Sequence, residues 1–179
     1  MQTRNQGFSL FELMIGLSIM SVLVALAVPS FQDYGRSTRV IATQNEVVTA
    51  LNFARNEAIR RSTPVTVCAT SNFTACTAST TWVDGWMAFV DNGGAASAVD
   101  AGDEILQSWQ GPGNNGVAVA ATGPSAAWVQ FTATGLANPT TTNKSVLIQS
   151  HSCASGELRR LRVTVNGIGA IRNDRVACT

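Results

Sequence analysis

The hydrophobic and polar positions divide the chain into three parts. Residues 8–28 are apolar except for Glu12 and a few small polar side chains, so a helix formed by them would be hydrophobic on every side. At ~1.5 Å per residue this helix would be about 30 Å long, which is enough to cross the hydrocarbon core of a bilayer. We therefore expect residues 8–28 to form a membrane-spanning helix.

In the second part, apolar residues recur three, four or seven positions apart, with polar side chains between them. They are Val40, Val47, Leu51, Ala54 and Ala58. This spacing predicts an amphipathic helix that lies on a domain core, so that residues 29–63 form the second half of one long helix. Pro29 and Gly35 are expected to bend or interrupt the helix, and Pro64 to end it.

After Pro64 the pattern changes to short apolar or alternating runs between turn residues. Strands are predicted at residues 65–69, 82–90, 104–109, 117–120, 127–133, 145–150, 158–165 and 168–172. The last two flank Asn166-Gly167, a dipeptide typical of two-residue hairpins. A long helix followed only by strands cannot build parallel βαβ units. The expected fold class is therefore α+β, with the helix across one face of a mainly antiparallel sheet formed by residues 64–179.

The composition and the charge distribution add to this picture. Charged residues are 13% of the chain and there are 15 glycines, a composition that favours an exported, β-rich domain. Residues 84–104 carry five acids and no base, whereas residues 159–175 carry five arginines and one acid. Such an asymmetry indicates binding partners rather than a particular fold.

Four cysteines lie outside the apolar run: Cys68, Cys76, Cys153 and Cys178. In an exported domain we expect them to form two disulfides, for which three pairings can be drawn. We favour Cys68–Cys76, which closes a short loop, and Cys153–Cys178, which holds the C-terminus. Each would contribute ~2–4 kcal/mol. Free buried thiols and a zinc site are the less favoured alternatives.

The N-terminal stretch has three interpretations. An ordinary signal peptide would be cut after Ala27, so that the mature chain began at Val28, but its apolar region would be shorter and free of carboxylates. A plain membrane anchor explains Glu12 only as part of a Ser9-x-x-Glu12 capping box. The third interpretation rests on Gly7-Phe8, on Glu12 four residues later, and on the proline that closes the run.

This third pattern resembles the class III signal of type IV pilins and type II secretion pseudopilins. The resemblance implies that a prepilin peptidase removes residues 1–7 by cutting between Gly7 and Phe8, and that Phe8 is then N-methylated. It also implies that Glu12 meets the N-terminal amine of a neighbouring subunit. A carboxylate buried among apolar helices needs such a cation beside it.

The rest of the chain is similar to the GspH/FimT/FimU group. The matching segments are residues 54–59, 65–68, 82–91, 103–106, 129–131 and Gly135. The resemblance implies a type IV pilin fold and a structural minor pilin in the tip or priming complex of a type IV pilus. Alternatively, it implies the minor pseudopilin H of a type II secretion system.

The same resemblance implies where the chain resides and what it meets. The expected location is the inner membrane, in a single pass with a periplasmic C-terminal domain, and later a pilus or pseudopilus fibre. The expected partners are other minor and major pilins or pseudopilins, the prepilin peptidase and the inner-membrane assembly platform.

Some FimT members also bind DNA for uptake, through a C-terminal Gly-Arg-x-Arg motif. The matching segment Gly169-Ala170-Ile171-Arg172 lacks the first arginine. The arginines that are candidates for phosphate contacts are Arg159, Arg160, Arg162, Arg172 and Arg175. A strict two-residue turn at Asn166-Gly167 would place Arg162 and Arg172 on opposite faces, whereas a bulge at Gly169 would change this. The alternative is a charged edge strand protected against aggregation.

Enzymatic chemistry is not indicated. His151 is the only histidine, and the sequence places no serine or cysteine to act with it. The acids of residues 91–104 do not match the spacing of an EF-hand loop, and a loose calcium site there is a minor alternative. We expect no catalytic residue, no cofactor and no metal site.

Overall fold

The computed structural model describes residues 7, 9–93, 95–113, 115–123 and 126–178. The chain forms two compact units, with the boundary after Gly35. Helix α1 (Leu10–Arg61) contributes to both units. The chain is helical through Pro29 and Gly35, so the predicted interruption is absent. Proline removes one hydrogen bond and glycine costs about 1 kcal/mol, while the neighbouring turns remain bonded.

In the second unit, α1 buries the face that the sequence pattern predicts. Val40, Leu51 and Ala58 are among its buried residues, together with the polar Thr43 and Gln44. The helix ends as Ser62 adopts a left-handed backbone conformation and the Thr63 amide donates to the carbonyl oxygen of Ala58. This closure satisfies carbonyl groups at the end of the helix, directly before Pro64.

The first sheet has five antiparallel strands in the order β3-β2-β1-β5-β6. They are β1 (Val65–Ala69), β2 (Gly85–Val90), β3 (Glu104–Gln110), β5 (Trp128–Phe131) and β6 (Ala137–Asn138). Both β1 and β2 are buried along their whole length. One face belongs to the main core, and the other carries a second cluster of Cys68, Met87 and Phe89.

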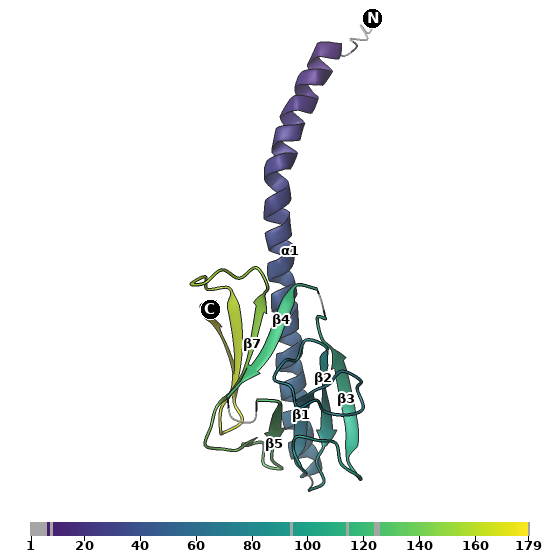
Figure 1. Ribbon diagram of the computed structural model, residues 1–179, viewed down its shortest axis with the longest axis vertical. Helices are drawn as coiled ribbons and strands as arrows, with labels where there is room; N and C mark the ends of the chain where they lie inside the picture. Colours follow the sequence, from purple (N-terminus) through teal and green to yellow (C-terminus); the bar gives the residue numbers. More distant parts are fainter. Residues whose placement is uncertain (1–6, 8, 94, 114, 124–125, 179) are drawn as a thin grey trace, which may run out of the picture. The chain divides into compact units, whose positions relative to one another are not determined.

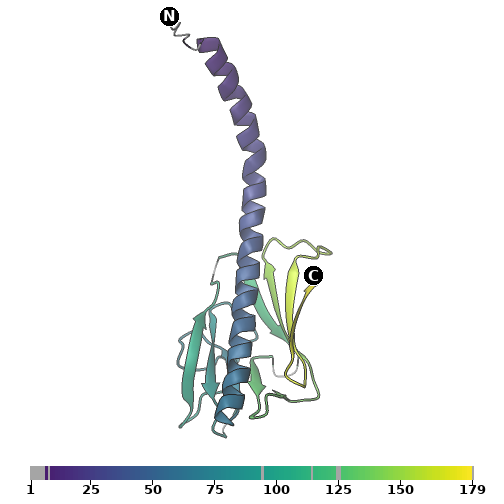
Figure 2. The same ribbon diagram turned by 180° about the vertical axis from the view of Figure 1, so that it is seen from behind.

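The second sheet has four antiparallel strands in the order β4-β7-β8-β9. They are β4 (Val117–Thr122), β7 (Lys144–Ser150), β8 (Arg160–Val165) and β9 (Ile171–Val176). Burial alternates along β4 and β7, so one face of this sheet joins the core and the other faces solvent. The second half of α1 lies against both sheets (Figures 1 and 2).

The expectation of one sheet is therefore wrong in this detail. The connection from β3 to β4 is rich in glycine and contains Pro112. Its residues interrupt the strand pattern, and β4 pairs with β7 rather than with β3. The two-residue β6 was also not predicted, because so short an element has no periodic signal.

The predicted two-residue hairpin at Asn166-Gly167 is also wrong. Val165 pairs with Ile171, so that a five-residue loop of residues 166–170 joins β8 to β9. The side chain of Asn166 accepts a hydrogen bond from the Ala170 amide at 2.8 Å, and Gly169 has a φ of 76°. The asparagine therefore closes a wider loop that needs a left-handed glycine.

This loop meets the turn before β6 and the helix in one close contact. The Arg55 Nε donates to the carbonyl oxygen of Gly135 at 3.0 Å, and the Ala137 amide donates to the carbonyl oxygen of Gly167 at 3.1 Å. A Cβ atom on Gly169 would collide with the carbonyl oxygen of Gly135. Gly169 thus permits the backbone of one sheet to approach the other.

We predict that Gly169→Ala destabilises the fold more than Gly116→Ala does. Both glycines have positive φ, but a Cβ at Gly116 would meet no atom within 4 Å. Each substitution costs about 1–2 kcal/mol of backbone strain, and the collision at Gly169 adds about 1–3 kcal/mol. Urea unfolding of the full chain in detergent micelles measures the difference. Equal losses of unfolding free energy would contradict the close contact.

Lys144 of β7, in the second sheet, contacts Trp128 of β5, in the first. Its side chain is buried, its Nζ lies 3.4 Å from the centroid of the Trp128 ring, and it donates to the Trp128 carbonyl oxygen at 3.0 Å. Burial lowers the pKa of Lys144 to about 8. The cation is held by a ring face and a carbonyl dipole, which compensate part of its lost hydration.

From the lowered pKa of Lys144 we predict that the stability of the fold rises with pH within a defined range. The pKa of Lys144 is about 8 in the folded chain and 10.5 when the side chain is not buried. The unfolded chain therefore holds the proton more tightly. The free energy of unfolding should rise between about pH 8 and 10.5, by at most about 3 kcal/mol. Lys144→Met should lack this rise, since it retains every other titrating group. The same pH dependence of the unfolding free energy in the wild-type chain and in Lys144→Met would refute this prediction.

Candidate functional site

The first unit, as far as the described residues reach, is the apolar half of α1. Its stretch Leu10–Ala27 is long and apolar enough to cross a membrane, judged by length and composition, and none of it is buried within the chain. Phe11 is 71% exposed and Leu26 is 70% exposed. A helix that is apolar on all sides needs lipid or other protein around it.

The hydroxyl groups in this stretch are satisfied within the helix. Ser18 donates to the carbonyl oxygen of Met14 at 2.8 Å, and Ser21 donates to that of Ser18 at 2.7 Å. Such bonds let serine enter an apolar environment without leaving its hydroxyl unpaired. Neither hydroxyl therefore needs a partner from outside the helix.

Glu12 is the charged residue in the first turn of α1, and it is exposed. The partial positive charge of a helix N-terminus favours a carboxylate in this turn. That effect is too weak to support a carboxylate in an apolar bundle, where it requires a cation. Gly7 is exposed and non-helical, whereas Phe8, the expected site of methylation, lies outside the described residues.

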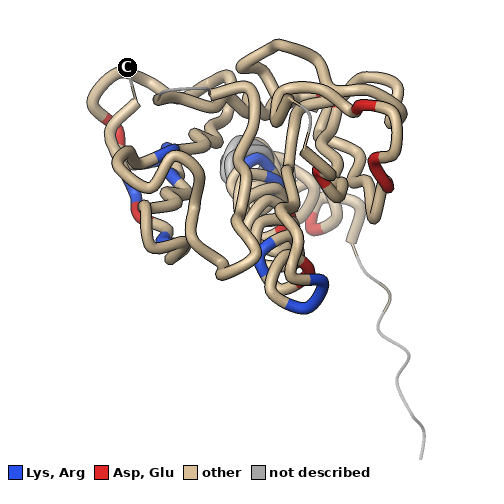
Figure 3. Tube along the Cα trace, turned by 90° about the horizontal axis from the view of Figure 1, so that it is seen from below, with Lys and Arg blue, Asp and Glu red and all other residues tan. Residues whose placement is uncertain are grey.

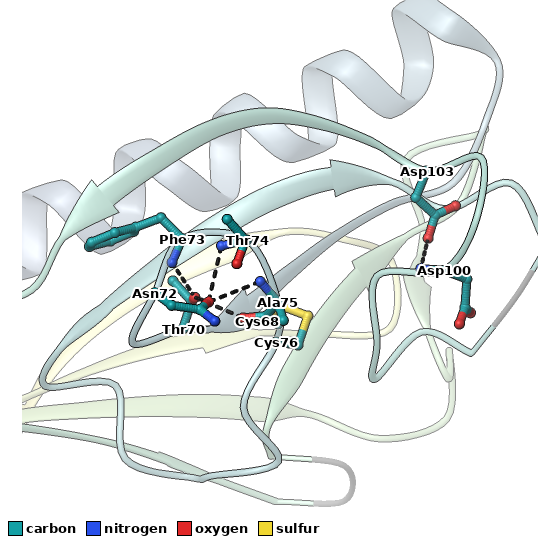
Figure 4. The surroundings of a disulfide bond; sticks show 9 residues. All are labelled: Cys68, Thr70, Asn72, Phe73, Thr74, Ala75, Cys76, Asp100 and Asp103. Atoms are coloured by element: carbon teal, nitrogen blue, oxygen red, sulfur yellow. Dashed lines mark hydrogen bonds between the residues drawn. A yellow bond between two sulfur atoms is a disulfide. The ribbon is translucent and has the colours of Figure 1, made fainter.

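The first disulfide joins Cys68 in β1 to Cys76, in one half of the pairing favoured from the sequence. The loop between them is ordered by its own side chains (Figure 4). The Asn72 Oδ1 accepts from the amides of Thr74 and Ala75, and the Thr70 hydroxyl donates to the Ala75 carbonyl oxygen at 2.8 Å. The disulfide and these bonds hold the loop beside the second core cluster.

The second disulfide joins Cys153 to Cys178, with their Cα atoms 5.8 Å apart. The Cys178 amide donates to the carbonyl oxygen of Glu157, and the Gly156 amide donates to that of Cys178. The end of the chain is therefore tied to the loop that precedes β8. Both disulfides have structural roles in the second unit.

The five candidate arginines lie in or beside β8 and β9. Arg162 pairs with Asp174 and Thr164 pairs with Arg172 in the register of these strands, so Arg162 and Arg172 share one face. Arg175 pairs with Leu161 and belongs to the other face. The strict two-residue turn that would have put Arg162 and Arg172 on opposite faces is absent; an irregularity at Gly169 was the alternative, and the wider loop there shifts the register.

Three of these arginines already have partners. Arg162 forms an ion pair with Asp174, and Arg159 forms one with Glu157 at 3.5 Å. Arg160 is buried and its Nε donates to the Gln149 Oε1 at 2.6 Å. Arg172 and Arg175 are exposed. Figure 3 shows these basic strands on one side of the second unit and the acids of the β2–β3 connection on the other.

The acids between β2 and β3 bind their own loop. The Asp103 carboxylate accepts from the amides of Asn92 and Asp100, and the Asp100 carboxylate accepts from the Ala95 amide at 2.8 Å. Within the described residues, no group of three or more histidine, cysteine or acidic side chains could hold a metal ion. These carboxylates therefore order the loop by capping its amides.

An ion network at the end of α1 was not anticipated from the sequence. Glu57 accepts from the Nε atoms of Arg60 and Arg61, and Arg61 also reaches Glu104 of β3 at 2.6 Å. The hydrogen bonds from Arg60 and then Arg61 lower the pKa of Glu57 to about 2. The helical spacing of three and four residues was the available signal. The contact to Glu104 depends on the tertiary fold.

Two sequence families match the chain. Over residues 43–169 it matches the family described as Type II transport protein GspH, and over residues 2–28 it matches the prokaryotic N-terminal methylation motif. Two curated proteins of Pseudomonas aeruginosa, each described as a fimbrial protein, are 39% identical to it over 66 residues. The match covers 37% of this chain and only 42% of each relative.

Solved structures share the fold. Two crystal structures of the type IV minor pilin FimU of Pseudomonas aeruginosa superpose with TM-scores of 0.57 and 0.53, at 19% and 20% identity. The first covers 76% of this chain and 89% of its own, and the second 74% and 90%. The predicted α+β type IV pilin fold is thereby confirmed.

The family match covers most of the chain, and pilins and pseudopilins are structural proteins without enzymatic activity. The prediction that the chain is not an enzyme is thus confirmed. The methylation motif and the apolar helix together indicate anchoring in the inner membrane and assembly into a pilus or pseudopilus. The chain belongs to the GspH family, within the group of type IV minor pilins and GspH-like pseudopilins that includes FimT and FimU.

Proposed function

We propose that the protein is a minor pilin that assembles into a type IV pilus, in its tip or priming complex. The observation that carries this proposal is the fully exposed apolar stretch Leu10–Ala27, which begins with a carboxylate in its first turn. In the inner membrane, lipid covers this surface. In a fibre, helices of other pilins take the place of the lipid, and the apolar surface remains out of water.

The order of events follows from the N-terminal motif. The prepilin peptidase removes residues 1–7 by cutting between Gly7 and Phe8, and Phe8 is N-methylated. The residues from Arg36 onward lie in the periplasm, where the oxidising conditions suit the disulfides Cys68–Cys76 and Cys153–Cys178. The inner-membrane assembly platform then transfers the subunit into the fibre.

Glu12 directs this transfer. In the lipid phase its position in the first turn keeps it near the membrane surface, where a carboxylate is least costly. Inside a bundle of helices it requires a cation, and the N-terminal amine of a neighbouring subunit supplies one. The ion pair therefore stabilises the subunit at one position along the fibre axis and not at others.

The alternative within the family is the minor pseudopilin H of a type II secretion system. The family description names a type II transport protein, which supports this alternative. The match to fimbrial proteins over 66 residues and the fold of the minor pilin FimU support a pilus. We favour the pilus because two independent comparisons agree on it.

Glu12→Ala should exclude the protein from fibres without changing its synthesis. We expect at least a tenfold loss from the sheared fibre fraction, because the carboxylate no longer selects its neighbour. Ser21→Ala is the matched control, since it alters the same helix at a hydroxyl that bonds only internally. Immunoblots of membrane and sheared fractions measure both variants. Finding normal amounts of Glu12→Ala in fibres would contradict the proposal.

A second candidate function, DNA binding for uptake, is favoured by the register of β8 and β9. Arg162 and Arg172 share one face, and Arg172 is exposed, whereas Arg175 lies on the opposite face of the same edge strand. Phosphate binding needs several cations on one surface. The ion pair of Arg162 with Asp174 lowers the charge available for DNA, so this function ranks second.

If DNA is bound there, Arg172→Ala should weaken binding about threefold and reduce the salt slope by about 1. Replacing Arg159, which pairs with Glu157, by alanine is the control and should have a smaller effect. Gel shifts with duplex DNA across salt concentrations, using the full chain in detergent, give both quantities. The absence of a salt-sensitive shift at micromolar protein would rule this function out.

A further inference from the structure

An open cavity of about 630 Å³, with a mixed polar and apolar lining, lies at one end of the first sheet. It is lined by the end of the helix, the start of the β2–β3 connection, β5 and β6. The lining residues that matter here are Thr63, Asp91, Asn92, Ala96, Gln130 and Asn138. None of them belongs to the N-terminal motif or to the arginine face.

A chain of three side chains reaches from the rim of this cavity to a buried carboxylate. The Asn138 Nδ2 donates to the Gln130 Oε1 at 2.6 Å, and the Gln130 Nε2 donates to the Asp91 Oδ2 at 2.6 Å. Gln130 and Asn138 are cross-strand neighbours in β5 and β6. Asp91 is 3% exposed and Gln130 is 6% exposed.

The carboxylate of Asp91 has neutral partners only. Besides Gln130, the Gly93 amide donates to its Oδ1 at 3.1 Å. Within the described residues, no ion pair joins Asp91 to an arginine or lysine. No described cation offsets the charge of this carboxylate, and a cation beside a buried carboxylate stabilises it strongly.

The surroundings add to the demand for a cation. The adjoining β2–β3 loop adds negative charge, because the Asp103 carboxylate accepts from the amides of Asn92 and Asp100, whereas Glu104 is paired with Arg61. Among the described residues, no cluster of three or more histidine, cysteine or acidic side chains lies here to hold a metal ion. One carboxylate flanked by amides suits a guanidinium or ammonium group.

We propose that this cavity binds the side chain of an arginine or lysine from a neighbouring subunit. The identity of the partner rests on the proposed assembly into a fibre, whereas the chemistry of the cavity does not. The cationic head pairs with the Asp91 carboxylate, and its aliphatic stem lies along Ala96. The cavity thereby fixes one contact between globular domains.

The chemistry is tested by titrating the full chain in detergent micelles with N-acetyl-arginine amide and N-acetyl-lysine amide. N-acetyl-citrulline amide is the uncharged control of nearly the same shape. We expect saturable NMR shifts of the Gly93 amide and of the Gln130 and Asn138 side-chain amides with the cations. Shifts that do not saturate, or that citrulline reproduces, would overturn the proposal. Tighter binding of Ca²⁺ at the same resonances would also overturn it.

Substitutions then locate the site. Asp91→Asn should weaken the binding of the arginine probe at least tenfold, and the side-chain amides of Gln130 and Asn138 can reverse to preserve the hydrogen bonds. Asp84→Asn makes the same charge change at an exposed carboxylate and should change binding less than twofold. Ala96→Leu narrows the cavity where the stem of the ligand would lie, leaves Asp91 in place, and should also weaken binding tenfold. Wild-type affinity in both Asp91→Asn and Ala96→Leu would refute the site.

The source of the cation is tested in cells, with a photo-reactive amino acid at Ala96. Cross-links to an arginine- or lysine-containing peptide of another pilin, lost in Asp91→Asn, support the proposal. Cross-links that persist in Asp91→Asn, or that join only peptides without such residues, would refute the assigned partner. Exclusion of the wild-type chain from fibres would instead contradict the proposed function and leave the titration unaffected.

Discussion

The packing of the second half of α1 against two separate sheets is the contact on which the second unit depends. Leu51, Ala54 and Ala58 are fully buried, and they join residues of both sheets in one core. A buried leucine contributes about 2–3 kcal/mol, while the alanines let the strands come close to the helix axis. At one end, the Arg55 side chain of the helix bonds the Gly135 carbonyl oxygen, and the backbone of Gly169 lies against that of Gly135.

The same helix meets a different requirement in its first half. Leu10–Ala27 exposes apolar side chains all round and satisfies its serine hydroxyls internally, so it accepts either lipid or other helices as surroundings. The second half has a polar face and a buried face. One element thus serves as a membrane anchor, in our account, and as the spine of a water-exposed domain. In our account, the Glu12 carboxylate is unfavourable in lipid and becomes favourable in a helix bundle, where a cation pairs with it.

Much of this could be predicted from the sequence because the signals are local. The apolar run at residues 65–69 predicts β1, and the spacing of Val47 and Leu51 predicts the buried face of the helix. The hairpin prediction was wrong because the Asn166 side chain bonds the Ala170 amide and closes a wider loop. The periodic pattern contains no information about this hydrogen bond. The bond nevertheless determines the face on which Arg172 lies, because it sets the length of the loop.

Other features depend on contacts between distant parts of the chain. The division into two sheets follows from which strands pair, and local periodicity does not determine pairing. The cavity at Asp91 arises because β5 and β6 bring Gln130 and Asn138 to it. In the sequence these residues are ordinary polar positions, and only the sheet order makes them one hydrogen-bonded chain.

The central claim is that the apolar helix leaves the membrane for a fibre after removal of the leader. Mass spectrometry of the N-terminal peptide of the protein recovered from sheared fibres tests this claim most directly. We predict a chain that begins with N-methylated Phe8 and retains Glu12 near its end. A protein that is absent from fibres and begins at Val28 in the soluble periplasmic fraction would contradict the account, because it would show an ordinary signal peptide.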